Sequence, residues 1–167
     1  MNRRLFSMIL MAAFGSLCIP AWAGGKKENK VTVTFHIEAD NNDNPKLIFP
    51  EPVGGRVRIF RRLPDITIRD IKDFAAFQAK DGVSYGLLIS LKDNAATRLA
   101  AITATNPERY LLAMVNGRAV DAALIDKQIT DGKLVIWKDV TALEIQELDK
   151  QVPRSGKDKA KDKDKKQ

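Results

Sequence analysis

Two turn signals, Asn116-Gly117 and Asp131-Gly132, lie close together between residues 114 and 137, and short apolar runs flank each of them. Asn-Gly is typical of a two-residue hairpin turn, in which both central residues adopt positive φ angles. We therefore expect Asn116 and Gly117 to join two antiparallel strands, and Asp131 and Gly132 to return the chain to the sheet. This pattern predicts a structural role for these residues rather than a functional site.

Alternation of apolar and polar residues predicts further strands. It runs through residues 31–39, with His36 on the polar side, and through residues 56–61. Such a period of two is typical of half-buried strands. Between them, Asn and Asp residues, two prolines and Gly54-Gly55 indicate little regular structure.

The middle of the chain carries a less regular pattern. Residues 66–79 mix β-branched residues with helix formers, and we interpret them as extended. A turn at residues 80–82 leads into residues 83–92, whose apolar density fits a central strand. Three more strand-like runs follow, at residues 109–115, 119–125 and 133–137.

Two helices are indicated by caps and by apolar spacing. Asp93 or Asn94 can cap a helix that ends at Asn106-Pro107. Thr141 and Glu144 form a capping-box pattern for a second helix, which Pro153 stops. The buried face of this second helix is expected to comprise Leu143, Ile145, Leu148 and Val152.

This order of elements predicts an α+β fold: a small mixed or antiparallel sheet with two helices packed on one face, in a single domain over residues 31–153. Residues 1–23 resemble a secretory signal peptide with cleavage near Ala23. Residues 24–30 are a linker, and residues 154–167 are a Lys/Asp-rich tail expected to be disordered. The mature protein is expected to be exported, in the periplasm or outside the cell.

Charge and composition exclude several function classes. The chain has a net charge of +7, but residues 31–153 hold 16 basic and 17 acidic residues, so the excess belongs to the ends. A nucleic-acid module would place its positive charge on the folded part. The sole cysteine, Cys18, leaves with the signal peptide.

Catalytic and metal-binding patterns are weak. His36 is the only histidine, so a catalytic triad or a histidine metal site lacks partners. Asp40 and Asp43 resemble a calcium loop in composition only, because the required Gly and terminal Glu are missing. We expect no enzyme activity, no metal and no cofactor.

One basic cluster stands out in the folded part. Alternation places Arg56 and Arg58 on one face of a strand, beside Phe60. With Arg61 and Arg62 they are the candidate binding residues for an anionic or peptide partner. The alternative is an ordinary solvated strand face, or an edge protected by charge.

Residues 85–151 carry a family resemblance. They contain a strand, a helix ending in Thr, a strand running into an Asn-Gly turn, a spaced set of Ile and Gly residues, and a helix introduced by Thr141 and Glu144. This order resembles the head subdomain of the first periplasmic domain of SecD, part of the SecDF component of bacterial protein export. The SecD-head-like part covers about residues 83–152. Two departures are Ala123-Leu124, where the family usually has Pro, and the WKDV connection.

The resemblance implies a protein-interaction domain without catalysis, because the SecD head is thought to contact emerging polypeptide. SecD couples proton flow to its periplasmic domain through transmembrane helices, and the expected mature chain offers no such segment, so we do not expect a motor. The expected partners are polypeptide or envelope and translocase proteins. The alternative is an envelope-associated protein held to anionic surfaces by its basic tail.

Overall fold

The structure is a computed structural model that describes residues 30–40 and 42–156. The expected signal peptide and most of the expected linker and tail lie outside these residues. Two short 3₁₀ helices occur at Pro45–Leu47 and Ile68–Asp70. The other elements are β1 (Val33–Ile37), β2 (Ile48–Val53), β3 (Arg56–Arg61), β4 (Ile66–Thr67), β5 (Ile71–Gln78), β6 (Tyr85–Leu91), α1 (Asp93–Thr105), β7 (Tyr110–Val115), β8 (Arg118–Leu124), β9 (Lys133–Val140) and α2 (Ala142–Asp149).

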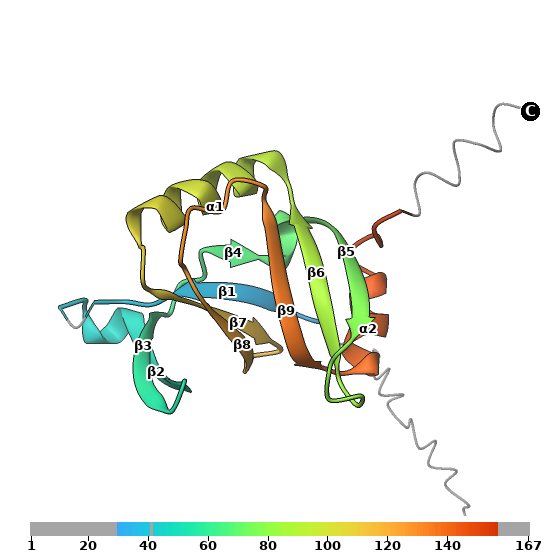
Figure 1. Ribbon diagram of the computed structural model, residues 1–167, viewed down its shortest axis with the longest axis horizontal. Helices are drawn as coiled ribbons and strands as arrows, with labels where there is room; N and C mark the ends of the chain where they lie inside the picture. The colour runs from blue at the N-terminus through green and yellow to red at the C-terminus, as the bar shows by residue number, and fades with distance from the viewer. Residues whose placement is uncertain (1–29, 41, 157–167) are drawn as a thin grey trace, which may run out of the picture.

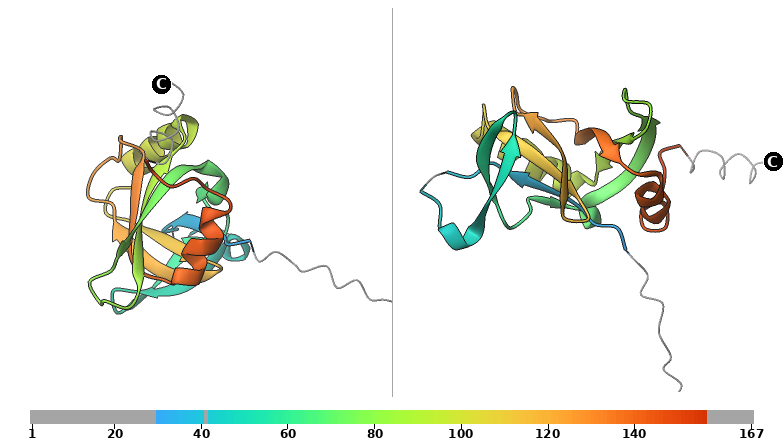
Figure 2. Two further views of the ribbon diagram at one scale, coloured as in Figure 1. Left: turned by 90° about the vertical axis from the view of Figure 1, so that its right-hand side faces the viewer. Right: turned by 90° about the horizontal axis from the view of Figure 1, so that it is seen from below.

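The described strands form three antiparallel sheets, in the orders β4-β1-β7-β8, β2-β3 and β5-β6-β9. The expected α+β class is therefore confirmed, with three sheets in place of one. In Figure 1, α1 lies along the top of the molecule and α2 beside β5, while the β2-β3 hairpin lies at the opposite end from α2. Figure 2 shows the same separation from below.

One large core joins both larger sheets and both helices. The odd-numbered residues of β1 face this core, as the alternation predicted. They share it with Phe74 of β5, Leu87 of β6, Leu99 of α1 and Leu148 of α2. A second, smaller cluster lies on the other face of β1 and β7. It consists of Val53, Phe60 and Leu112 with partly buried neighbours. The molecule therefore has a covering layer outside its four-stranded sheet.

That covering layer is the β2-β3 hairpin, which corrects the expectation of little regular structure before Arg56. Pro50 and Pro52 lie within β2, opposite Ile59 and Val57. The Arg62 N–H donates to the Leu47 carbonyl, so the main-chain groups of odd-numbered residues in this segment face β3. Those of Pro50 and Pro52 face the other side, where their missing N–H groups break no bond to β3. A proline at the edge of a sheet removes no ladder hydrogen bond. The two-stranded sheet therefore tolerates both residues.

Both helix starts differ in detail from the expectation. Lys92, not Asp93 or Asn94, is the N-cap of α1 and makes no side-chain capping bond; Asp93 is the first helical residue. At α2 the Thr141 hydroxyl accepts from the Glu144 N–H and the Glu144 carboxylate accepts from the Thr141 N–H. Leu143, expected in the core, is 66% exposed because Ile145 and Leu148 occupy the inward side.

The two glycine turns have distinct environments. Asn116 and Gly117 have φ angles of 52° and 76° and connect β7 to β8. Gly132 has a φ of 63°, and a Cβ atom built on it would lie 2.6 Å from the Cβ of Ala96 in α1. Strand β9 then pairs with β6 rather than with β8. Gly132 is thus required both by its backbone angle and by the close approach of a helix.

The described chain continues beyond the expected end of the domain at residue 153. Arg154 forms a parallel bridge with Phe74, and its guanidinium pairs with Asp149 at 2.5 Å. The Ser155 N–H donates to the Phe74 carbonyl at 2.8 Å. Residues 154 and 155 are therefore part of the packed structure, which corrects the boundary expected for the tail.

Candidate functional site

An open pocket of about 590 Å³ lies at one end of the β5-β6-β9 sheet. We call it the aromatic pocket, and its exposed wall is mainly apolar. Trp137 of β9 is 61% exposed, and its ring lies edge-on to that of Phe77 of β5, with centroids 6.1 Å apart. The lining residues are Phe77, Gln78, Lys80, Asp81, Trp137 and Lys138.

Gly86 of β6 allows the two rings to meet across the sheet. It lies opposite Phe77 in the β5-β6 ladder, and a Cβ atom built on it would be 2.3 Å from Phe77 Cζ and 2.6 Å from the carbonyl oxygen of Ile136. The Phe77 ring therefore lies over the β6 backbone. Any side chain at Gly86 would displace it.

Strand β9 presents Trp137 because its apolar residues alternate. Leu134 and Ile136 face the core, whereas Trp137 lies on the outer face. The main-chain N–H of Trp137 donates to the carboxylate of Asp121 in β8 at 2.7 Å, and this bond links β9 to the neighbouring sheet. The main chain of Trp137 is therefore held while its ring stays exposed.

Charged side chains surround the aromatic pocket. Lys80 and Lys138 contribute to its wall, and Asp81 lies in the turn before β6. The Asp81 carboxylate accepts from the Ser84 hydroxyl and from the N–H groups of Val83 and Ser84, and these bonds lower the pKa of Asp81. Asp81 is thus committed to the turn as an anion, and the two lysines remain as the polar rim.

The arginine cluster predicted to bind a partner has a different organisation. Arg58 donates to the Glu38 carboxylate at 2.8 Å, and its guanidinium carbon lies 4.1 Å from the ring centroid of Tyr110. The pKa of Arg58 is raised, first by its hydrogen bond to Glu38. Arg58 therefore attaches the β2-β3 hairpin to β1 and β7.

Phe60, placed beside Arg58 by the alternation, has no exposed surface. It packs within the smaller core cluster, so it cannot contact a partner in this conformation. Arg62 donates to the Ile48 carbonyl at 2.9 Å. Arg56 and Arg61 are exposed, and among the described residues no side-chain hydrogen bond or ion pair holds them. Arg56 and Arg58 line one open pocket together with Glu38 and Asp40, whereas Phe60 lies in the core beneath.

His36 is buried, although its position on the polar side of β1 predicted exposure. The β2-β3 hairpin covers that side, and the His36 ring meets Phe49 edge-on at 5.4 Å. Its Nδ1 donates to the Arg61 carbonyl at 2.8 Å, and its Nε2 lies 2.9 Å from the Thr34 hydroxyl oxygen. Burial lowers the pKa of His36, which favours the neutral ring.

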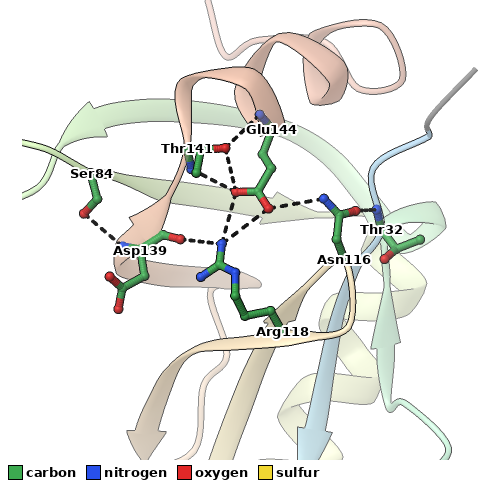
Figure 3. Close-up of polar contacts among 7 residues, drawn as sticks. All are labelled: Thr32, Ser84, Asn116, Arg118, Asp139, Thr141 and Glu144. Carbon is green, nitrogen blue, oxygen red and sulfur yellow. Dashed lines mark hydrogen bonds and ion pairs between the residues drawn. The ribbon is translucent and has the colours of Figure 1, made fainter.

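Three of the turn and cap residues predicted as scaffold, Asn116, Thr141 and Glu144, meet in space. Figure 3 shows the Glu144 carboxylate between the Thr141 cap, the Arg118 guanidinium and the Asn116 amide. Arg118 also donates to the Asp139 carbonyl at 2.8 Å. This polar cluster joins the β7-β8 turn, the end of β9 and the start of α2.

Within residues 30–40 and 42–156, no three His, Cys, Asp or Glu side chains are grouped so that they could hold a metal ion. In the same residues no helix has the length and apolarity needed to cross a membrane.

No protein-family model matches the sequence, and no curated protein matches it either. Solved structures do share its architecture. A structure of SecDF, a membrane component that enhances protein export, aligns with a TM-score of 0.52 at 18% sequence identity, over 71% of this chain and 60% of the other. The fold is SecDF-like.

A second SecDF structure, in a super-membrane-facing form, aligns with a TM-score of 0.50 at 20% identity, over 71% of this chain and 18% of that one. This chain thus spans 60% of the first SecDF chain and 18% of the second. At these identities the similarity concerns the fold, and it agrees at that level with the resemblance of residues 85–151.

Phe77 and Trp137, which form the aromatic pocket, were not among the residues predicted from the sequence. The available signal was a tryptophan on the polar side of an alternating strand.

Proposed function

We propose that this chain is a non-catalytic protein-interaction module that binds extended polypeptide at the aromatic pocket and acts in protein export. The observation that carries the proposal is the exposed Phe77–Trp137 pair on a SecDF-like fold. The proposed location is outside the cytoplasm, after removal of the N-terminal segment.

The chemistry of the aromatic pocket supports a polypeptide ligand. Aromatic residues are enriched in the centres of protein interfaces, where a polar rim surrounds them. Trp137 combines a large apolar ring with an N–H donor, so it can contact apolar side chains and main-chain carbonyls alike. Lys80 and Lys138 supply the rim at this pocket.

The placement of the titratable groups supports a role without catalysis. His36 is buried and occupied by two hydrogen bonds, and its burial lowers its pKa. Asp81 and Glu144 serve a turn and a helix start. None of these three side chains faces the aromatic pocket with a free acid or base.

Intrinsic fluorescence tests polypeptide binding directly. The chain has two tryptophans, so a full-length Trp22→Phe variant leaves Trp137 as the sole reporter. Titration with reduced, carboxymethylated ribonuclease A, a permanently unfolded polypeptide without tryptophan, should shift the Trp137 emission to shorter wavelength as the ring leaves water. Native ribonuclease A should cause no shift.

A variant series locates the binding. Trp137→Ala should lose affinity for the labelled unfolded polypeptide, measured by fluorescence anisotropy. Leu124→Ala is the matched control, because Leu124 is also an exposed apolar strand residue, outside the aromatic pocket. Equal affinity of Trp137→Ala and the unmodified chain would reject the pocket as the site.

The export part of the proposal needs its own test. Crosslinking in cells followed by purification of this chain should recover translocase subunits or exported polypeptides. Recovery of neither would contradict a role in export, whatever the outcome of the binding measurements.

A further inference from the structure

Strand β5 lies at the edge of its sheet, and part of that edge is already paired. The Phe74 N–H donates to the Pro153 carbonyl at 3.1 Å, and the Ser155 N–H donates to the Phe74 carbonyl at 2.8 Å. These two bonds make the parallel bridge between Phe74 and Arg154. The chain's own C-terminal segment thus adds to β5 as a short strand.

The remainder of this edge is unpaired among the described residues. Main-chain groups along a strand alternate between its two sides, so those of Ala76 and Gln78 point the same way as those of Phe74. The main-chain groups of the odd-numbered residues in this part of the strand point toward β6. The bond from the Ala79 N–H to the Ser84 carbonyl, just after β5, follows the same alternation. No described residue hydrogen-bonds to the main-chain N–H or C=O of Ala76 or Gln78.

The C-terminal segment does not continue along this edge. In the register set by Phe74, the next bond would join the Ala76 N–H to the Ser155 carbonyl, and that bond is not formed. Gly156 has a φ of 91°, outside the extended range. The two open positions therefore lie just beyond a segment that already pairs with the same strand.

The open edge adjoins the aromatic pocket. Phe77 lies between Ala76 and Gln78 in β5, and both Phe77 and Gln78 line the pocket. Side chains of adjacent strands that share a face lie within contact distance. A strand added at this edge would therefore place one side chain beside Phe77 at the pocket.

We propose that the free edge of β5 binds an extended polypeptide segment by strand addition. The main chain of the segment pairs with Ala76 and Gln78, and a large apolar side chain enters the aromatic pocket. Strand addition of this kind takes affinity from main-chain hydrogen bonds and specificity from pockets for alternate side chains. The proposal rests on the proposed function and deepens it: the ligand is unfolded chain in extended conformation, as continuity with the Pro153–Ser155 strand indicates.

Backbone-methylated peptides test the main-chain pairing with the full-length protein. The probe is a fluorescein-labelled peptide of alternating Phe and Thr with a Lys at each end, compared with two versions that are N-methylated on the Phe or on the Thr residues. Only alternate amides of an added strand face its neighbour, so one methylated version should lose binding and the other should keep it. Binding of the plain peptide and of both methylated versions would overturn strand addition while leaving the proposed function standing. Absence of binding by the plain peptide would count against both.

A pair of protein variants tests the same edge. Gln78→Pro removes an N–H that points away from β6, so the sheet should keep its thermal stability while affinity for the plain peptide falls about tenfold, the effect of one lost hydrogen bond. Gln78→Ala is the matched comparison. It loses the same side chain but keeps the N–H, so its affinity for the plain peptide should stay several-fold above that of Gln78→Pro. Unchanged affinity in Gln78→Pro would overturn the proposal. A second result would also overturn the proposal: a dimer of the chain that is lost in Gln78→Pro and that the peptide does not displace. The edge of β5 would then pair with a second copy of the chain.

Discussion

The Asn116 side chain in the β7-β8 turn donates a hydrogen bond to the Glu144 carboxylate in the first turn of α2, with Nδ2 and Oε1 3.2 Å apart. The same Asn116 side chain accepts from the Thr32 N–H at 3.0 Å, just before β1. Glu144 also accepts from Thr141 and Arg118, and its side chain is largely buried. A hairpin turn and a helix cap therefore stabilise each other.

Replacing Glu144 should destabilise the fold through this cluster. Glu144→Ala removes the capping-box acceptor and leaves Asn116 and Arg118 without it, so we expect a loss of about 2 kcal/mol in the free energy of unfolding. Urea unfolding followed by circular dichroism measures it. Glu144→Gln should lose less than half as much, because glutamine retains the capping box.

A neighbouring substitution provides the control for Glu144. Leu143→Ala changes an exposed residue of the same helix, and we expect a change within about 0.5 kcal/mol. A loss for Leu143→Ala as large as that for Glu144→Ala would contradict the assignment of the effect to the polar cluster.

Two glycines with similar positive φ angles should differ in their tolerance of alanine. Gly117→Ala pays only backbone strain, about 1 kcal/mol, because nothing lies within 4 Å of the added Cβ atom. Gly132→Ala adds a clash with Ala96, so we expect a loss of about 2–4 kcal/mol in the free energy of unfolding. Urea unfolding of both variants compares them. Equal losses would show that α1 does not press against this turn.

The buried His36 should make stability depend on pH. Its pKa is lowered in the folded protein by burial, so the unfolded chain binds a proton more readily. The free energy of unfolding should therefore be constant above about pH 7.5 and fall as the pH drops through about 6.5 toward the folded pKa. His36→Gln should remove this dependence between about pH 7.5 and 5.5, where the carboxylates stay ionised.

A direct measurement avoids any effect of that substitution on folding. Because His36 is the only histidine, a single imidazole resonance in proton NMR reports its titration. A midpoint below about 6.5 is expected, and a midpoint above it would contradict the burial of the ring under the β2-β3 hairpin.

Phe60 and Arg61 are adjacent in β3, but their replacement by alanine should affect the stability of the fold very differently. Phe60→Ala empties the centre of the smaller core cluster, and we expect a loss of about 3–5 kcal/mol in the free energy of unfolding. Arg61→Ala removes an exposed side chain and should change stability by less than about 0.5 kcal/mol. Thermal unfolding of the two variants tests this contrast, and a stable Phe60→Ala protein would place Phe60 outside the core.

Much of the local structure follows from the sequence. The strand at residues 56–61, the turn at Asn116-Gly117 and the cap at Thr141 all depend on interactions between residues a few positions apart. The β2 strand was not predicted, because prolines at positions 50 and 52 argue against a paired strand. A strand tolerates them only where their missing N–H groups face no neighbouring strand, and the sequence does not show this. Nothing near Lys92 indicated that it, rather than Asp93, would precede the helix.

The candidate site depended more strongly on three-dimensional packing. Alternation in β9 identifies which residues share a face with Trp137, but not whether another element covers that face. On β1 the polar face is covered by a hairpin and His36 is buried; on β9 the corresponding outer face is open and Trp137 is exposed. Likewise, the charge of Arg58 is evident from its residue type, whereas its partner Glu38 lies 20 residues away.

Short-range patterns in this chain thus specify its strands, turns and caps, because backbone angles and hydrogen bonds within a few residues decide them. Which faces become core, covering layer or open surface depends on how sheets and hairpins distant in sequence pack together, because burial is a property of the assembled layers. The aromatic pocket exists only at that level, as does the edge of β5 that no described residue pairs beyond Phe74.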